Sequence, residues 1–294
     1  MCAGRGAPNT FGMRRTNVAP PNYALPMAAD TPALLGTRLR DPRRLAAMLL
    51  LGLSGGIVLA LLIARGELAG SDARAYWVAV RLWLGGGDPF DPGAPFLPYA
   101  YAPWTLYFFL PWALLPWSVA WFFWRALTIV LFAWSVAWAY ERRPLATALL
   151  VAALVPALAA NFDTGNVGVL LILGVWAAQF VGPRLGGLLW AVAAAMKWLP
   201  AMLIVFLPPR ARLWGLAFLL VAMVLALATW PQTLRQVEIV LFFPRPPRLD
   251  YLLLIWAAVP WLWRQPWPLP PPRLRLPRSV ADIRRELASF FGYG

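Results

Sequence analysis

Residues 46–64 read AAMLLLGLSGGIVLALLIA, an uncharged apolar segment close to the roughly 20 residues that a helix needs to cross a bilayer. Spans of this kind must be helical, because the bilayer interior offers no partner to an unpaired backbone group, and period-two alternation of a barrel is absent. The sequence therefore predicts an all-α polytopic membrane protein with about seven to nine spans. Further uncharged runs lie at 92–124, 126–140, 145–162, 164–183, 185–196, 198–209, 213–234 and 251–263.

Composition supports this class and excludes others. Apolar residues make up 61% of the chain and charged residues 13%, whereas a soluble domain carries about 25% charged residues. The formal charge of +14 does not indicate nucleic-acid binding, because the basic residues flank the apolar runs, as the positive-inside rule requires. These basic positions are Arg38, Arg40, Arg43 and Arg44, then Arg142 and Arg143, and finally Arg273 to Arg285.

The reactive side chains are few. Cys2 is the one cysteine and there is no histidine. This excludes an internal disulfide, a metal site with His or Cys ligands, and a Ser-His or Cys-His nucleophile pair. Any chemistry must use carboxylates, Lys, Arg and Tyr.

Three regions are predicted. Residues 1–45 are polar and Arg-rich, and we expect a disordered basic cytoplasmic tail. Residues 46–265 form the transmembrane domain, whose first helix is uncleaved and leads outward. Residues 266–294 combine a Pro-rich linker with an amphipathic helix that lies on the inner leaflet or, alternatively, docks a partner.

Asp72 follows the first apolar run, just past the predicted membrane edge. A carboxylate at this position can act as a general base on a lipid-borne substrate. The alternative is a helix N-cap for an interfacial helix at 73–84, since Asp is a preferred capping residue. From the residue chemistry alone the two readings are equally good.

Several motifs then follow in order. After Asp72 and Tyr76 come Gly87-Asp88-Pro89-Phe90-Asp91-Pro92, Tyr99-Ala100-Tyr101-Ala102-Pro103, and Pro111-Trp112-Ala113-Leu114-Leu115-Pro116. Asn161-Phe162-Asp163-Thr164-Gly165-Asn166-Val167 and Ala193-Ala194-Ala195-Met196-Lys197-Trp198-Leu199-Pro200 complete the series. Across roughly residues 66–215 this order resembles glycosyltransferase family 87, of the C-type membrane glycosyltransferase (GT-C) superfamily.

The resemblance implies an integral membrane enzyme that transfers mannose from a polyprenyl phosphate to a lipid or glycan acceptor by inverting displacement. It implies Asp72 as the catalytic base, with no cofactor and no specified metal. The expected partners are membrane lipids, the donor and the acceptor, at an extracytoplasmic site of the cell membrane. Expected substrate-binding residues are Tyr76, Asp88, Tyr99, Tyr101, Asn161, Asp163, Gly165 and Asn166.

Two isolated cations, Lys197 and Arg125, are candidates to hold the donor phosphate. For Lys197 the alternative is a helix-end side chain that reaches the surface, and for Arg125 a paired residue of the bundle. Asp163 is the second candidate base, with a turn residue as its alternative. Asp88 and Asp91 are also typical of residues that shape Asp-Pro turns.

The chain departs from the family pattern at three places. Tyr101-Ala102-Pro103 stands for Tyr-Pro-Pro, Gly165-Asn166-Val167-Gly168 lacks the usual Gln, and Ala73 replaces an aromatic residue. These differences keep a non-catalytic alternative open, either a transporter of lipid-linked sugar or an inactive, shortened relative. The sequence lacks the internal repeat that many transporters show.

Two topologies are possible around residues 100–116. If this segment crosses the membrane, the 161–166 turn lies on the opposite side from Asp72. If it is re-entrant or interfacial, the turn joins Asp72 and Arg142 lies inside. Pro103, Pro111 and the positive-inside rule favour the second topology.

Overall fold

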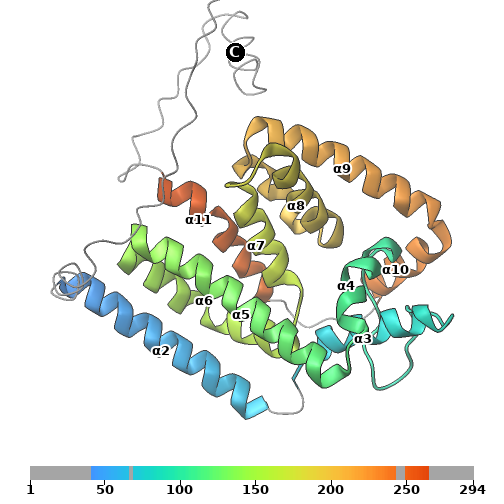
Figure 1. Ribbon diagram of the computed structural model, residues 1–294, viewed down its shortest axis with the longest axis horizontal. Coiled ribbons are helices and arrows are strands. Elements are labelled where there is room, and N and C mark those ends of the chain that lie inside the picture. Colours follow the sequence, from blue (N-terminus) through green and yellow to red (C-terminus); the bar gives the residue numbers. More distant parts are fainter. Residues whose placement is uncertain (1–40, 66–68, 243–248, 265–294) are drawn as a thin grey trace, which may run out of the picture. The chain divides into compact units, whose positions relative to one another are not determined.

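The computed structural model describes residues 41–65, 69–242 and 249–264, and within these ranges every regular element is a helix (Figure 1). The predicted all-α class is confirmed. Residues 1–40 of the predicted tail and all of 266–294 lie outside the described residues. In chain order the elements are α2 (Pro42–Arg65), α3 (Ser71–Leu84), η2 (Pro103–Thr105), α4 (Leu106–Ala113), α5 (Trp117–Arg142), α6 (Pro144–Thr164), α7 (Gly168–Ala178), α8 (Pro183–Met196), η3 (Leu199–Phe206), α9 (Pro209–Ala228), α10 (Trp230–Phe242), η4 (Leu249–Leu253) and α11 (Leu254–Arg264).

By length and composition, four helices of the described residues can cross a membrane, namely α2, α5, α6 and α9. This is fewer than the predicted seven to nine spans. Proline and glycine explain the difference, because they divide the later apolar runs into short pieces. Gly165 ends α6, Pro183 starts α8 and Pro200 lies in η3, so that α7, α8 and the 251–264 segment are shorter apolar helices.

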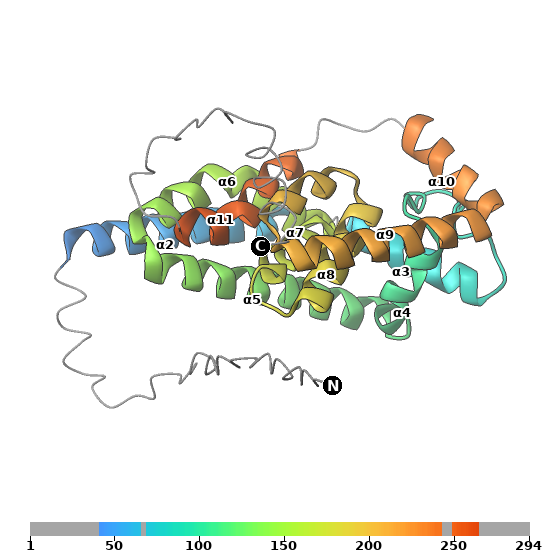
Figure 2. The ribbon, with the colours of Figure 1, turned by 90° about the horizontal axis from the view of Figure 1, so that it is seen from above.

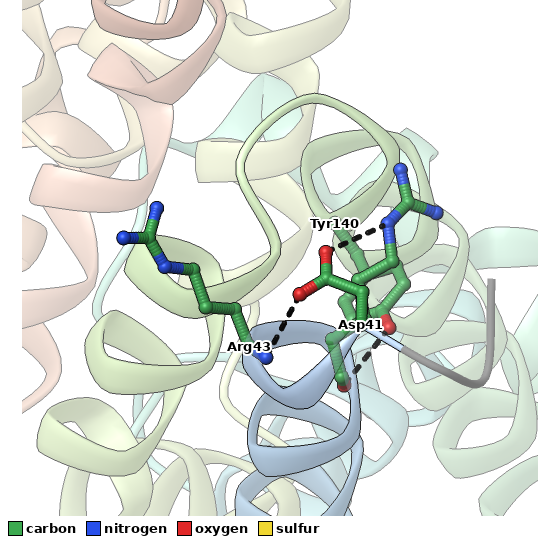
Figure 3. A network of polar contacts seen from close by, with 4 residues as sticks. Asp41, Arg43 and Tyr140 are labelled. Atoms are coloured by element: carbon green, nitrogen blue, oxygen red, sulfur yellow. Dashed lines mark hydrogen bonds and ion pairs between the residues drawn. The ribbon is translucent and has the colours of Figure 1, made fainter. Parts of the chain in front are cut away.

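Helix α2 begins at Pro42, before the predicted boundary at residue 46, because Asp41 caps it. The Asp41 carboxylate accepts a hydrogen bond of 3.0 Å from the backbone N–H of Arg43 and lies 3.8 Å from the Arg44 guanidinium (Figure 3). The Tyr140 hydroxyl donates to the Arg44 carbonyl at 3.3 Å. The start of α2 is therefore fastened to the end of α5.

Contacts at the other ends fix the helix directions. Arg65, at the end of α2, forms an ion pair with Asp163 near the end of α6, and Arg125, early in α5, donates to the carbonyl of Phe162. Helices α2 and α6 thus run parallel, with α5 antiparallel to both, and α2 and α5 each pack against α6 (Figures 1 and 2).

The 100–116 segment does not form a span. It contains only the three-residue η2 and the eight-residue α4, whose length of about 12 Å is far below the roughly 30 Å of a bilayer core. The chain then enters α5 at the same end at which α2 left. As the second predicted topology requires, the end of α6 lies beside the start of α3, while the side of the membrane stays a prediction.

Helices α7 and α8 form a hairpin that starts and finishes near this end. Helix α7 begins at Gly168, directly after the α6 turn, and α8 finishes at Met196, just before Lys197. The Trp190 indole donates to the Pro200 carbonyl at 3.1 Å and holds η3 against α8. Lys197 therefore lies beside the turn that follows α6.

Candidate active site

Asp72 lies in the first turn of α3 and does not cap it. The residue before the helix is Gly70, at φ 86°, and no side chain caps the helix. The backbone N–H of Gly70 donates to the Asp163 carbonyl at 2.6 Å, which joins the start of α3 to the end of α6. The capping prediction for Asp72 is wrong, and its half-buried carboxylate is open to another partner.

That partner is Asn166. Helix α6 ends at Gly165, whose φ of 68° reverses the chain, and the Asn166 amide group then donates to Asp72 Oδ2 at 2.6 Å. The Asn166 side-chain carbonyl accepts from the backbone N–H of Gly168 at 2.8 Å and from Lys197 Nζ at 2.7 Å. One amide therefore connects an anionic and a cationic side chain, and these partners fix its orientation.

Lys197 is the chain's one lysine, and it follows the last turn of α8 in an extended conformation. Its ammonium group reaches into the cluster and is half-buried.

Asn161 faces the same point from α6. Its amide nitrogen donates to the Ala157 carbonyl at 2.9 Å, while Oδ1 is buried with no hydrogen-bond partner among the described residues. A Cβ atom placed on Gly168 would lie 3.2 Å from Asn161 Oδ1 and 3.2 Å from Lys197 Nζ. Three polar side chains, Asn161, Asn166 and Lys197, thus converge at Gly168.

Tyr76 supports this cluster from α3. Its hydroxyl accepts a hydrogen bond from the backbone N–H of Val167 at 3.4 Å and lies 3.1 Å from the Tyr101 hydroxyl. The Tyr99 hydroxyl lies 2.6 Å from Thr105 Oγ1. All three tyrosines are buried, and burial raises the pKa of Tyr76 and of Tyr99 well above the ordinary value, so that both stay protonated.

Asp163 and Arg125 lie behind the turn. Asp163 is 8% exposed and pairs with Arg65 at 3.2 Å, and the Arg125 guanidinium donates to the Phe162 carbonyl at 3.3 Å and stacks over the Trp121 ring at 4.6 Å. These contacts fasten the end of α6 to α2 and α5. For Arg125 this supports the alternative of a paired residue of the bundle, whereas Asp163 lies within α6 and is not the turn residue that its alternative described.

Asp88 has separate partners. Its Oδ1 accepts from the Phe90 backbone N–H at 2.9 Å, which shapes the Asp-Pro turn, and its Oδ2 forms an ion pair with Arg235 of α10. Asp88 is therefore outside the hydrogen-bonded cluster of Asp72.

An aromatic face of α5, not predicted from the sequence, also contacts the α6 turn. The indole of Trp124 donates to the Gly165 carbonyl at 2.9 Å, and Trp121 stacks on Trp117 at 5.8 Å. A Cβ atom on Gly165 would come within 2.5 Å of the Trp121 ring. The i, i+4, i+7 spacing of these tryptophans places them on one helix face, which is the signal that could have found them.

The described residues contain no group of three His, Cys, Asp or Glu side chains that could hold a metal ion. The chemistry open to the cluster is that of one accessible carboxylate, one ammonium group and the amides between them. Such a set can accept a proton and can bind an anion.

Comparison with known proteins identifies a family. The family model described as glycosyltransferase family 87 matches residues 99–245, half of the chain. The match includes the tyrosine segment, the α6 turn and Lys197, and begins after Asp72. No curated protein and no solved structure matches the chain.

Proposed function

The chain belongs to glycosyltransferase family 87 and is a membrane glycosyltransferase, and we propose that it transfers a sugar from a polyprenyl phosphate to a lipid or glycan acceptor. By the resemblance of its motifs the sugar is mannose. The proposed donor is lipid-borne, which fits a cluster at one end of apolar helices.

The reaction is an inverting displacement. The acceptor oxygen forms a bond to the anomeric carbon, and the bond from that carbon to the phosphate oxygen breaks. Asp72 takes the proton of the acceptor hydroxyl as general base. The lipid phosphate leaves with the electron pair, and Lys197 stabilises its negative charge. No general acid is needed, because a phosphate leaves without protonation.

The observation that carries this proposal is the single amide of Asn166 between Asp72 and Lys197. It holds a base and an anion-binding group at a spacing fixed by one side chain. A displacement needs these two groups on either side of one carbon atom. Tyr76 and Tyr101 act as positioning residues, since Tyr76 holds the backbone directly after Asn166.

Charge distribution supports an extracytoplasmic site. Arginine favours the cytoplasmic end of a membrane helix bundle. The end of α5, opposite Asp72, is rich in arginine and lies beside the start of α2. Basic residues at this opposite end are Arg43, Arg44, Arg142 and Arg143. We therefore infer that α2 leads outward and places Asp72 outside.

Reconstitution tests the function. The purified full chain in lipid nanodiscs receives radiolabelled polyprenyl-phosphate mannose and a lipid extract from cells that lack the protein. We expect mannose to appear on a component of that extract, identified by mass spectrometry. Movement of the donor across a liposome membrane without any new glycoside would instead indicate the transporter alternative.

A further inference from the structure

A groove separate from the Asp72 cluster lies between the end of α3, the Asp88 turn, η2, α4 and the last turn of α9 with α10. Its volume is about 620 Å³, within the range of about 300–1,000 Å³ typical of ligand sites. The lining residues that matter for its chemistry are Trp83, Asp88, Trp104, Tyr107, Gln232 and Arg235. We propose that this groove binds a neutral pyranose ring of the acceptor.

Aromatic rings form one wall. Trp83 and Tyr107 meet edge to face with ring centroids 5.0 Å apart, and Tyr107 is 62% exposed. The C–H face of a pyranose packs on an aromatic ring, and tyrosine and tryptophan also offer a polar edge. An exposed tyrosine braced by a tryptophan gives a flat, fixed platform for such a ring.

A charge pair also lines the groove. Asp88 and Arg235 neutralise each other, and their side chains are 38% and 59% exposed. A guanidinium has five N–H donors and a carboxylate about four acceptor sites, so that both keep groups for sugar hydroxyls. Gln232, one helical turn before Arg235, adds an amide. The paired charges favour a neutral polyhydroxy ligand over a phosphate.

Two aromatic residues of the groove lining, Trp104 and Phe90, also contact neighbouring parts of the fold. Trp104 also lines a neighbouring apolar groove of about 510 Å³, whose wall includes Ala195 of α8, close in sequence to Lys197. The groove is also backed by Phe90, which contacts Tyr99 at 6.0 Å. Tyr99 in turn contacts the ring of Tyr76 at 6.5 Å, so the groove is joined to the tyrosines that support the α6 turn. Its assignment to the acceptor rests on the proposed function.

Saturation-transfer NMR on the full chain in nanodiscs tests the groove, with methyl α-D-mannopyranoside as the probe. We expect binding to wild type, binding about tenfold weaker in Tyr107→Ala, and weaker binding in Arg235→Gln. Tyr251→Ala is the matched control, because Tyr251 is also exposed, at 42%, and lies on η4. Inorganic phosphate is not expected to compete.

Two further measurements separate this proposal from the function. Asp72→Asn should bind the mannoside as wild type does while it loses transfer, and Tyr107→Ala should raise the acceptor KM and leave the donor KM unchanged. Three results would overturn the proposed sugar site: no mannoside binding by wild type, binding by Tyr107→Ala equal to wild type, or loss of binding in Asp72→Asn. Mannoside binding by a wild-type protein that transfers no sugar would refute the function and the acceptor assignment but leave the sugar site.

Discussion

At the scale of single residues, Asn166 organises the site. Its two amide ends distinguish a carboxylate from an ammonium group, because the nitrogen only donates and the oxygen only accepts. The chain has Asn166 where the family pattern has Gln, and Gly168 leaves the space into which Asn161, Asn166 and Lys197 point. The departure at this turn is thus compatible with a complete polar cluster.

Lys197→Met is expected to weaken binding of polyprenyl-phosphate mannose by roughly 10- to 100-fold, because a charged hydrogen bond contributes about 1.5–3 kcal/mol. Lys197→Arg should keep part of the affinity. The measurement is equilibrium binding of the donor in nanodiscs. Arg184→Met is the control. Arg184 is exposed at the start of α8 and stacks over the ring of Trp214 of α9. Unchanged affinity in Lys197→Met would remove Lys197 from phosphate binding.

Tyr76→Phe is expected to lower the free energy of unfolding by about 1–3 kcal/mol, since it leaves the buried Val167 N–H without its acceptor. Thermal unfolding in detergent measures this, with exposed Tyr107→Phe as the control. Burial raises the pKa of Tyr76, so the hydroxyl is neutral from pH 6 to pH 9 and contributes no titration there. A pH–rate profile that changes shape in Tyr76→Phe would contradict a purely positioning role.

At the scale of elements, the junction of α3, α5 and α6 positions Asp72. Gly165 makes this junction possible. Its φ of 68° suits glycine, and the absence of a side chain lets Trp121 and Ala73 pack close to its backbone. A Cβ atom there would lie 2.6 Å from the Cβ of Ala73. The family's aromatic residue after the base is replaced here by Ala73, and the small side chain fits this close approach.

Gly165→Ala is expected to destabilise the fold by at least about 1–2 kcal/mol and to reduce transfer, because alanine is strained at positive φ and would push α3 from α6. Gly174→Ala is the matched control, since Gly174 lies in α7 and an added Cβ would have no neighbour closer than 3.9 Å. Differential scanning fluorimetry compares the two variants. Equal melting temperatures would show that the junction tolerates a side chain.

The local sequence predicted which helices and turns carry the site residues better than it predicted the contacts between distant residues. The apolar runs predicted the membrane class, and the second topology predicted that the 161–166 turn lies beside Asp72. The sequence named Lys197 only as a candidate phosphate ligand, and its hydrogen bond to Asn166 was not predicted. The Asp88–Arg235 pair joins residues 147 positions apart, and no local pattern indicates such a contact. The tryptophan face of α5 was hidden because aromatic residues are common throughout this chain.

At the scale of the whole molecule, the described helices have the apolar surface of a membrane protein. Large apolar side chains are exposed along α2 and α9, among them Leu49, Ile63 and Val224, as lipid contact requires. The cluster of Asp72, Asn166 and Lys197 lies at one end of the helices. The number of spans was overestimated because hydropathy counts apolar residues, whereas proline and glycine decide where a helix stops.

Cysteine labelling tests the orientation in a Cys2→Ser background. Ser71→Cys, at the exposed start of α3, should react with an impermeant thiol reagent on intact cells. Glu141→Cys, exposed near the end of α5, should react only in inverted vesicles. The reverse pattern would place Asp72 on the cytoplasmic side and contradict an extracytoplasmic site.

The most direct test of the account is sugar transfer by purified Asp72→Asn in nanodiscs with polyprenyl-phosphate mannose and the acceptor extract. Asparagine keeps the size of the side chain but cannot take the acceptor proton, so we expect the rate to fall by about 10²- to 10⁴-fold, with donor affinity kept within a few fold. Asp91→Asn is the matched control, because Asp91 is exposed in the loop and should keep the wild-type rate. Transfer by Asp72→Asn at the wild-type rate would contradict the account.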